Sequence, residues 1–169
     1  KLAEFAKKRG FSCVIVPQQC MDGEKISSTR IRKLLEQGDL QAANRLLGHP
    51  HILSGVVGKG KQLGRTLGFP TANLPLPGGI LVPKCGVYAT KVTVGEDVYP
   101  AVTNVGIRPT VNGQDANVEC HLLDFAGDLY GKEITVAFYA FLRPEQKFDS
   151  LEDLKAQIAA DAAQVRKML

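Results

Sequence analysis

Apolar side chains recur at helical spacing near the start of the chain. In residues 1–9 they share one face, and Gly10 can end this helix because glycine readily adopts the left-handed backbone conformation. The segment ISSTRIRKLLEQ begins with serine and threonine and then places its apolar residues on one face, which predicts a second helix that stops at Gly38. Asp39 is the predicted N-cap of a third, short helix that ends at Gly48.

Between the first two helices, FSCVIVP (residues 11–17) predicts a short buried strand that ends at Pro17. A helix followed by a single strand is typical of the last unit of a larger α/β domain. We therefore predict two units, a short α/β remnant over residues 1–50 and a second domain over residues 51–169. Because the remnant has few neighbours, we expect its last two helices to pack on the second domain and its strand to be poorly supported.

From Ile52 onward the pattern changes to short runs rich in β-branched and aromatic residues. These runs are ILSGVV, GVYATKVTV, VYPAVTNVG, NVECHLLDF and KEITVAFYAFL. Gly95-Glu96-Asp97 predicts a hairpin loop, and strict alternation from Ile134 to Ala140 indicates a strand with one inward face. About five or six short strands without helices between them predict a mainly β fold, a small antiparallel barrel.

A helical pattern returns at the end of the chain. It begins near Asp149 and Ser150 and predicts an amphipathic C-terminal helix with one apolar stripe. The residues of the stripe are Leu151, Leu154, Ile158, Val165 and Leu169.

The composition is that of a globular protein. Hydrophobic residues make up 44% of the 169 positions and charged residues 22%, which excludes disordered and collagen-like classes. The chain lacks an apolar run long enough to span a membrane, and its first residues do not form a signal peptide. The four cysteines are too widely spaced for zinc or redox motifs, so we expect reduced thiols and a cytoplasmic location. The absence of an initial methionine predicts a fragment of a longer protein.

The net charge of +4 is unevenly divided along the chain. Basic side chains outnumber acidic ones in residues 1–111, and the reverse holds in residues 112–169. A cationic middle suits an anionic small ligand as well as a polynucleotide. A nucleic-acid-binding barrel would interleave aromatic and basic residues on exposed strands, whereas the aromatic residues here lie in strands with few basic ones. We therefore expect no nucleic-acid partner.

The segment GKGKQLGRTLGFPTAN (residues 58–73) combines glycines with basic residues. Its backbone N–H groups could approach phosphates closely. The spacing fits neither the Walker loop nor the G-x-G-x-x-G motif. A phosphate cradle of another class and a plain surface hairpin both remain open at this point.

Two neutral oxygen ligands follow in the same segment. Thr71 and Asn73 are two residues apart, so on an extended backbone they point to the same side. A hydroxyl and an amide carbonyl suit a Mg²⁺ ion that takes its remaining charge from ATP phosphates. A capped turn, in which both side chains bond their own backbone, is the alternative.

Glu119 lies inside the predicted strand NVECHLLDF, on the face opposite Cys120 and Leu122 and together with His121. A carboxylate in such a strand is more often turned to solvent than catalytic. If its face lines a pocket, Glu119 can remove a proton from a hydroxyl nucleophile.

Taken together, these stretches resemble the riboflavin kinase domain, which closes the bacterial bifunctional flavokinase/FAD synthetases. The resemblance is carried by residues 52–169, in the order GKQLGRTLGFPTAN, VTNVGIRPT, VECHLLDF, DLYGKEITVAFYAFLRPE and KFDSLEDLKAQI. It implies a six-stranded antiparallel Greek-key barrel with a C-terminal helix.

The resemblance also implies an activity, the ATP-dependent phosphorylation of the ribityl 5′-hydroxyl of riboflavin to give FMN and ADP. Glu119 matches the catalytic base, and Thr71 and Asn73 match the residues that hold Mg²⁺. The positions that match nucleotide-binding residues are Gly60, Arg65, Thr66, Thr71, Asn73, Leu122, Asp124 and Tyr130. The positions that match flavin-binding residues are Arg143, Gln146 and Asp153.

The segment ISSTRIR resembles the last motif of the FMN adenylyltransferase domain of the bifunctional enzymes, whose HxGH-type motif is absent from this sequence. The resemblance therefore implies an N-terminal adenylyltransferase domain in cis that this chain lacks. We expect a monomer that forms FMN and not FAD. A non-catalytic flavin- or nucleotide-binding module is the alternative, and it would have lost one of Thr71, Asn73 and Glu119, all of which are present.

Overall fold

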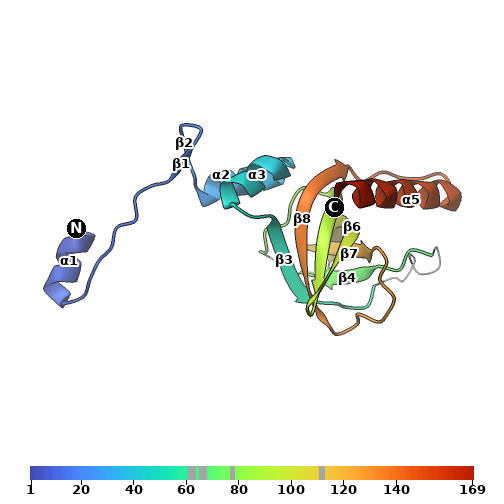
Figure 1. Ribbon diagram of the computed structural model, residues 1–169, viewed down its shortest axis with the longest axis horizontal. Helices are drawn as coiled ribbons and strands as arrows, with labels where there is room; N and C mark the ends of the chain where they lie inside the picture. Colours follow the sequence, from blue (N-terminus) through green and yellow to red (C-terminus); the bar gives the residue numbers. More distant parts are fainter. Residues whose placement is uncertain (61–63, 65–67, 77–78, 111–112) are drawn as a thin grey trace.

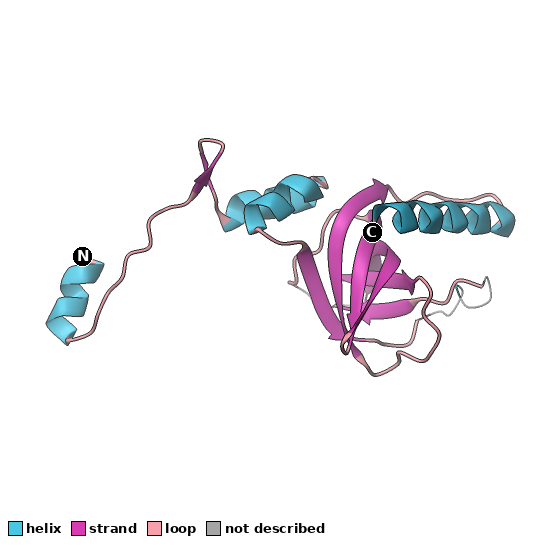
Figure 2. Ribbon diagram, viewed as in Figure 1, coloured by secondary structure: helices cyan, strands magenta, loops and turns pink. Residues whose placement is uncertain are grey.

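The computed structural model describes most of the chain. The described residues are 1–60, 64, 68–76, 79–110 and 113–169. Among them are four helices and eight strands, drawn in Figures 1 and 2.

Six antiparallel strands form one curled sheet (Figure 1). In spatial order they are β3 (His51–Val56), β8 (Glu133–Arg143), β5 (Gly86–Val94), β6 (Asp97–Thr110), β7 (Gly113–Leu122) and β4 (Ala72–Pro75). Strands β5, β6 and β7 pair consecutively, and β8 returns to lie beside β5, which is Greek-key order. The edge strands approach each other where the Gly58 N–H donates to the Asn73 carbonyl at 2.8 Å. The mainly β, six-stranded Greek-key prediction is therefore confirmed, as a curled half-barrel sheet.

The core is formed by the inward-facing side chains of strands whose apolar and polar residues alternate in the sequence. Val118, Cys120 and Leu122 of β7 point into the barrel, and the first two are fully buried. Tyr88 and Phe138 meet edge to face inside it, with ring centroids 5.3 Å apart. Strand β5 has the predicted bounds, whereas Asp97 opens β6 instead of belonging to the hairpin loop. Strand β4 was not among the predicted runs.

Helices α2 (Ser28–Gln37) and α3 (Leu40–Leu47) pack on the barrel, as expected. Ser27 accepts the first-turn hydrogen bond of α2, and Gly38 ends it in the left-handed conformation at φ 86°. Leu35, Leu40 and Ala43 belong to the same hydrophobic core as the strands. The core thus extends across residue 50, where the sequence suggested a domain boundary.

The prediction of a short buried strand over residues 11–17 is wrong. FSCVIVP forms no strand, and Val14 and Val16 are 85% and 77% exposed. A buried strand needs a hydrogen-bonding neighbour and apolar cover, and no strand of the described residues lies beside this segment. Figure 2 shows it as an extended connection between α1 (Leu2–Arg9) and a small hairpin. The strands of that hairpin are β1 (Cys20–Met21) and β2 (Glu24–Lys25).

Helix α5 (Leu151–Met168) begins after Ser150, whose hydroxyl accepts from the Asp153 N–H. Its Ala162 and Val165 pack on the outer face of the barrel, against a cluster that includes Val87, Val102 and Leu123. Leu151 is 55% exposed, contrary to the predicted stripe, because the first turn of the helix extends beyond the edge of this cluster. The barrel therefore has two apolar layers, an interior and a smaller one under α5.

Candidate active site

Two cavities open on the barrel, and Thr71 lines both of them. The first has a volume of about 590 Å³ and lies between the start of β4 and the loop that connects β7 to β8. The second has a volume of about 370 Å³ and lies between β5, β6, β7 and helix α5. The two cavities therefore adjoin at Thr71.

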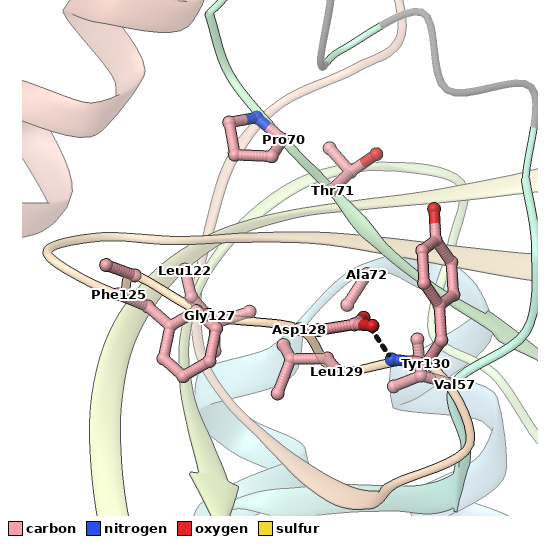
Figure 3. A pocket seen from close by; sticks show the side chains of 11 residues that line it. Val57, Pro70, Thr71, Ala72, Leu122, Phe125, Gly127, Asp128, Leu129 and Tyr130 are labelled. Carbon is pink, nitrogen blue, oxygen red and sulfur yellow. Dashed lines mark hydrogen bonds between the residues drawn. The ribbon is translucent and has the colours of Figure 1, made fainter.

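The first cavity has a mixed polar and apolar lining, with aromatic rings at its ends. Figure 3 shows the rings of Phe125 and Tyr130 on opposite sides, with Asp128 and Leu129 between them. The Asp128 carboxylate accepts a hydrogen bond from the Tyr130 N–H at 2.9 Å, which fixes the loop. Leu122, which the resemblance assigns to the nucleotide, forms part of the wall. Such a slot suits a flat aromatic group such as a purine base.

The second cavity combines an apolar floor with a polar rim. Val87 and Val102 of the barrel face Leu154 and Ile158 of α5 across it. The polar residues in its lining are Thr71, Asn104, Glu119, His121, Arg143, Glu145, Gln146 and Asp161. Glu119 and His121 thus lie on the cavity face of β7, and Cys120 on the core face, as the alternation predicts. Burial raises the pKa of the Cys120 thiol to about 12, so this cysteine stays protonated and serves as core.

Glu119 is held by a residue of its own strand and lies between two neighbouring strands. In the sheet register, Glu119 is opposite Asn73 of β4 on one side and Asn104 of β6 on the other. The Asn117 side-chain amide donates to Glu119 Oε1 at 2.7 Å. A carboxylate held in this way keeps one orientation toward the cavity, as a general base requires.

Close approach of glycine backbone fixes the surroundings of Thr71 and Asn73. A Cβ atom at Gly60 would lie 2.3 to 2.5 Å from three atoms of the Asn73 amide, and one at Gly64 would lie 2.4 Å from the Phe69 carbonyl. Asn73 is only 6% exposed. The two glycines therefore allow the loop backbone to lie directly against these two oxygen-bearing side chains. Arg65 and Thr66, predicted to bind nucleotide, lie outside the described residues.

Of the three residues predicted to bind the flavin, two line the second cavity and one does not. Arg143 and Gln146 line the second cavity. Asp153 lies in the first turn of α5, where its carboxylate accepts from the Ser150 hydroxyl at 2.7 Å, and it is not among the described residues that line either cavity.

Asp124 also lies apart from the cavity walls that the structure describes. Its backbone has a φ of 59°, and its carboxylate accepts hydrogen bonds from Arg166 near the end of α5. These hydrogen bonds lower the pKa of the Asp124 carboxyl below its ordinary value. The pair joins the β7–β8 loop to the C-terminal helix.

Asp161 is a site residue that the sequence patterns did not single out. It lines the second cavity, is 3% exposed, and pairs with Arg143 at 2.7 Å. A signal was available, because Asp161 occurs in the apolar stripe of α5, three residues after Ile158 and four before Val165. A lone acid on the buried face of a helix indicates a buried basic partner.

In the described residues, no helix is both long and apolar enough to cross a membrane. The same residues contain no group of three or more histidine, cysteine, aspartate or glutamate side chains able to hold a metal ion.

Comparison with known proteins finds one matching family model and curated relatives that share one name. The family model described as "Flavokinase: Riboflavin kinase" matches residues 47–169. The bifunctional riboflavin kinase/FMN adenylyltransferase of Escherichia coli (strain K12) is 48% identical over 167 residues, which are 98% of this chain and 53% of that protein. The protein of the same name from Listeria monocytogenes is 40% identical over 98% of this chain and 52% of its own length. The chain thus spans about half the length of the curated relatives it matches.

Solved structures also resemble this chain in fold. A crystal structure described as a macrolide-efflux protein from Streptococcus pneumoniae has a TM-score of 0.85 and 38% identity, over 97% of this chain and 54% of that one. Riboflavin kinase from Trypanosoma brucei has a TM-score of 0.53 and 30% identity, over 70% of this chain and 78% of that one. Because the family model covers the whole barrel with α5 and the curated relatives match nearly the full chain, the chain belongs to the riboflavin kinase family.

Proposed function

We propose that this chain transfers the γ-phosphoryl group of ATP to the 5′-hydroxyl of riboflavin, which gives FMN and ADP. The observation that carries the proposal is the meeting of two chemically different cavities at Thr71, with Glu119 in one of them. A two-substrate transfer needs such an arrangement, because the reacting atoms must be brought together in line.

ATP occupies the first cavity in this proposal. Its adenine ring packs against Leu122 and Tyr130, and its phosphates extend along Gly60 toward Thr71. Arg65 and Thr66 remain proposed nucleotide-binding residues that lie outside the described part of the chain. Asp124, held by Arg166, supports the β7–β8 loop that forms one wall. Riboflavin occupies the second cavity, with its flavin ring near Arg143 and Gln146 and toward the α5 end that contains Asp153.

Glu119 accepts the proton of the 5′-hydroxyl as that oxygen attacks the γ-phosphorus. The bond between the riboflavin 5′-oxygen and the γ-phosphorus forms. The bond between the γ-phosphorus and the oxygen that bridges it to the β-phosphate breaks, and ADP leaves. Asn117 keeps the carboxylate turned toward the hydroxyl by donating to Glu119 Oε1. Glu119 then has to release this proton before the next turnover.

The residues near the meeting point fit a Mg²⁺ ion that arrives with ATP. Thr71 and Asn73 carry neutral oxygen atoms, and the glycine cradle at Gly60 keeps the Asn73 amide in one place. Neutral oxygens suit an ion whose charge the nucleotide phosphates balance. We propose that these two residues would hold Mg²⁺, which when bound would neutralise negative charge on the phosphate oxygens.

Several properties of the whole protein belong to the same proposal. We propose a cytoplasmic monomer that uses small-molecule substrates and no nucleic acid, and a second domain in the full-length protein that adenylylates FMN. All four cysteines are free thiols in the structure, which supports a reducing compartment.

Incubation of the chain with riboflavin, ATP and Mg²⁺, followed by chromatography, tests the activity. We expect FMN to accumulate with one ADP for each FMN. A non-catalytic flavin-binding module would instead quench riboflavin fluorescence on binding without any FMN appearing, and that result would overturn the proposal.

A further inference from the structure

The cavity proposed for riboflavin contains a buried acid that the transfer chemistry does not use. Asp161 comes from the middle of α5 and is 3% exposed. Burial of a carboxylate is costly unless the charge is paired and its oxygens accept hydrogen bonds. The contacts of Asp161 therefore indicate what it does.

Asp161 and the Arg143 guanidinium form a bidentate ion pair. Arg143 Nε donates to Oδ1 and Oδ2 at 3.2 and 3.1 Å, and Nη2 donates to Oδ2 at 2.7 Å. Arg143 Nη1 donates to the Pro144 carbonyl at 3.3 Å, and the guanidinium carbon lies 5.8 Å from the Phe148 ring centroid. Paired contacts of this kind fix the plane of a guanidinium as well as its position.

Gln157, one turn before Asp161 on α5, extends this network. Its side-chain amide donates to Asp161 Oδ1 at 2.9 Å, and its carbonyl oxygen accepts from the Gln146 amide at 3.5 Å. The two cavity-lining residues assigned to flavin, Arg143 and Gln146, are thus both tied to the same helix.

We propose that Asp161 is a positioning residue for riboflavin, which acts by holding the Arg143 guanidinium in the orientation that receives the flavin ring. This inference rests on the proposed function. An arginine whose charge is already balanced presents N–H donors with little net attraction for anions, which suits the carbonyl oxygens of a neutral flavin ring. The Asp161 pair thereby favours riboflavin over an anionic ligand in this cavity.

Docking of α5 does not account for the pair. Ala162 and Val165 already bury the helix against Val87, Ala89 and Leu123. Apolar contact stabilises such an interface more than the pair does, because a buried ion pair contributes little net stability. Both residues of the pair also line the second cavity, where Arg143 is within reach of a ligand bound there.

The test is Asp161→Asn, which keeps the size of the side chain and removes its charge. Riboflavin affinity is measured by fluorescence quenching without ATP, and KM for MgATP and kcat are measured in turnover. We expect riboflavin affinity to fall about 10- to 100-fold, as for a lost hydrogen bond to a charged group. KM for MgATP should stay within about twofold, because ATP binds in the other cavity. Glu152→Gln, the same charge change at an exposed position of α5, is the matched control.

A double-mutant cycle with Arg143→Lys tests whether Asp161 acts through Arg143. Lysine keeps the charge but cannot make the bidentate contact. We expect the double variant to bind riboflavin no more weakly than Arg143→Lys alone, since contacting residues are coupled. Additive losses, or wild-type riboflavin affinity in folded Asp161→Asn, would overturn the inference.

If Asp161→Asn does not fold, Gln157→Met removes the second donor to Asp161 at a half-buried position. We expect it to weaken riboflavin binding several-fold, and unchanged affinity in this variant would equally overturn the inference. A wild-type chain that forms no FMN would refute the proposed function instead.

Discussion

At the scale of single residues, the Glu119 carboxylate is held by a neighbour on its own strand and lies between Asn73 and Asn104 in the sheet register. Glu119→Gln keeps this packing and removes the proton acceptor. We expect kcat for FMN formation to fall about 10²- to 10⁴-fold, the usual effect of a positioned base. Riboflavin affinity, measured by fluorescence quenching, should change little. Near-normal turnover in this variant would remove Glu119 from the catalytic role.

The contact between Gly60 and Asn73 gives a second prediction at this scale. Asn73→Ala should weaken MgATP binding and leave riboflavin binding unchanged, because only the nucleotide arrives with the ion. Gly60→Ala should have the same effect without replacing either proposed Mg²⁺ ligand, since the added Cβ would displace the Asn73 amide. Calorimetric titration of each variant with MgATP measures this. Unaltered MgATP affinity in both variants would favour the capped-turn interpretation of Thr71 and Asn73.

At the scale of elements, the junction of α3 and β3 joins the helices to the barrel. The backbone N–H of His51 donates to Asn44 Oδ1 at 2.7 Å, and the side-chain amide of Asn44 donates to the backbone carbonyl of Phe138 at 2.8 Å. The His51 ring packs near Phe138, with ring centroids 6.0 Å apart. Burial is the main cause that lowers the pKa of His51 below its ordinary value of 6.5. The junction is therefore built for a neutral imidazole.

This junction predicts a pH dependence of stability. Because the pKa of His51 is lower in the folded chain, its contribution is fully present above pH 6.5, where both states are neutral. Below that pH the unfolded state binds the proton first, so the free energy of unfolding should fall as the solution is acidified. Urea unfolding between about pH 8 and pH 5 measures this slope. His51→Gln should flatten it, and an equally steep loss in that variant would assign the effect to other groups.

At the scale of the whole molecule, the two cavities described above adjoin at Thr71. Adenylyl transfer needs a further site for the α-phosphate and the leaving pyrophosphate. We therefore expect this chain to stop at FMN even with excess ATP and Mg²⁺. Ser27 to Arg32 open α2 and could bind an anion at its N-terminus, but such binding would not by itself form FAD. Chromatography of the products decides, and FAD formed by this chain would contradict our interpretation of residues 1–50.

Much of this protein follows from the sequence because the underlying interactions are local. Caps at Ser27, Asp39 and Ser150 begin helices where the sequence indicates, since each cap side chain accepts one first-turn N–H, three residues further along the chain. Alternation in β7 predicts the faces of Glu119 and Cys120, because successive strand side chains point to opposite sides. Residue types in the loop before β4 and in β7 also carry the resemblance to the family.

Only the tertiary structure decided the features that depend on contacts between distant segments. FSCVIVP has the composition of a buried strand, yet it lies exposed because burial depends on neighbours that the described chain does not provide. The partner of Arg143 is 18 residues away on another element. The helical stripe marks Asp161 as a buried acid, but it does not say which basic residue pairs with it. Thr71 joins two cavities because curling of the sheet and docking of α5 bring their walls together. Local hydrogen bonding and side-chain periodicity can be read along a sequence, whereas pairing across the fold depends on which surfaces pack together.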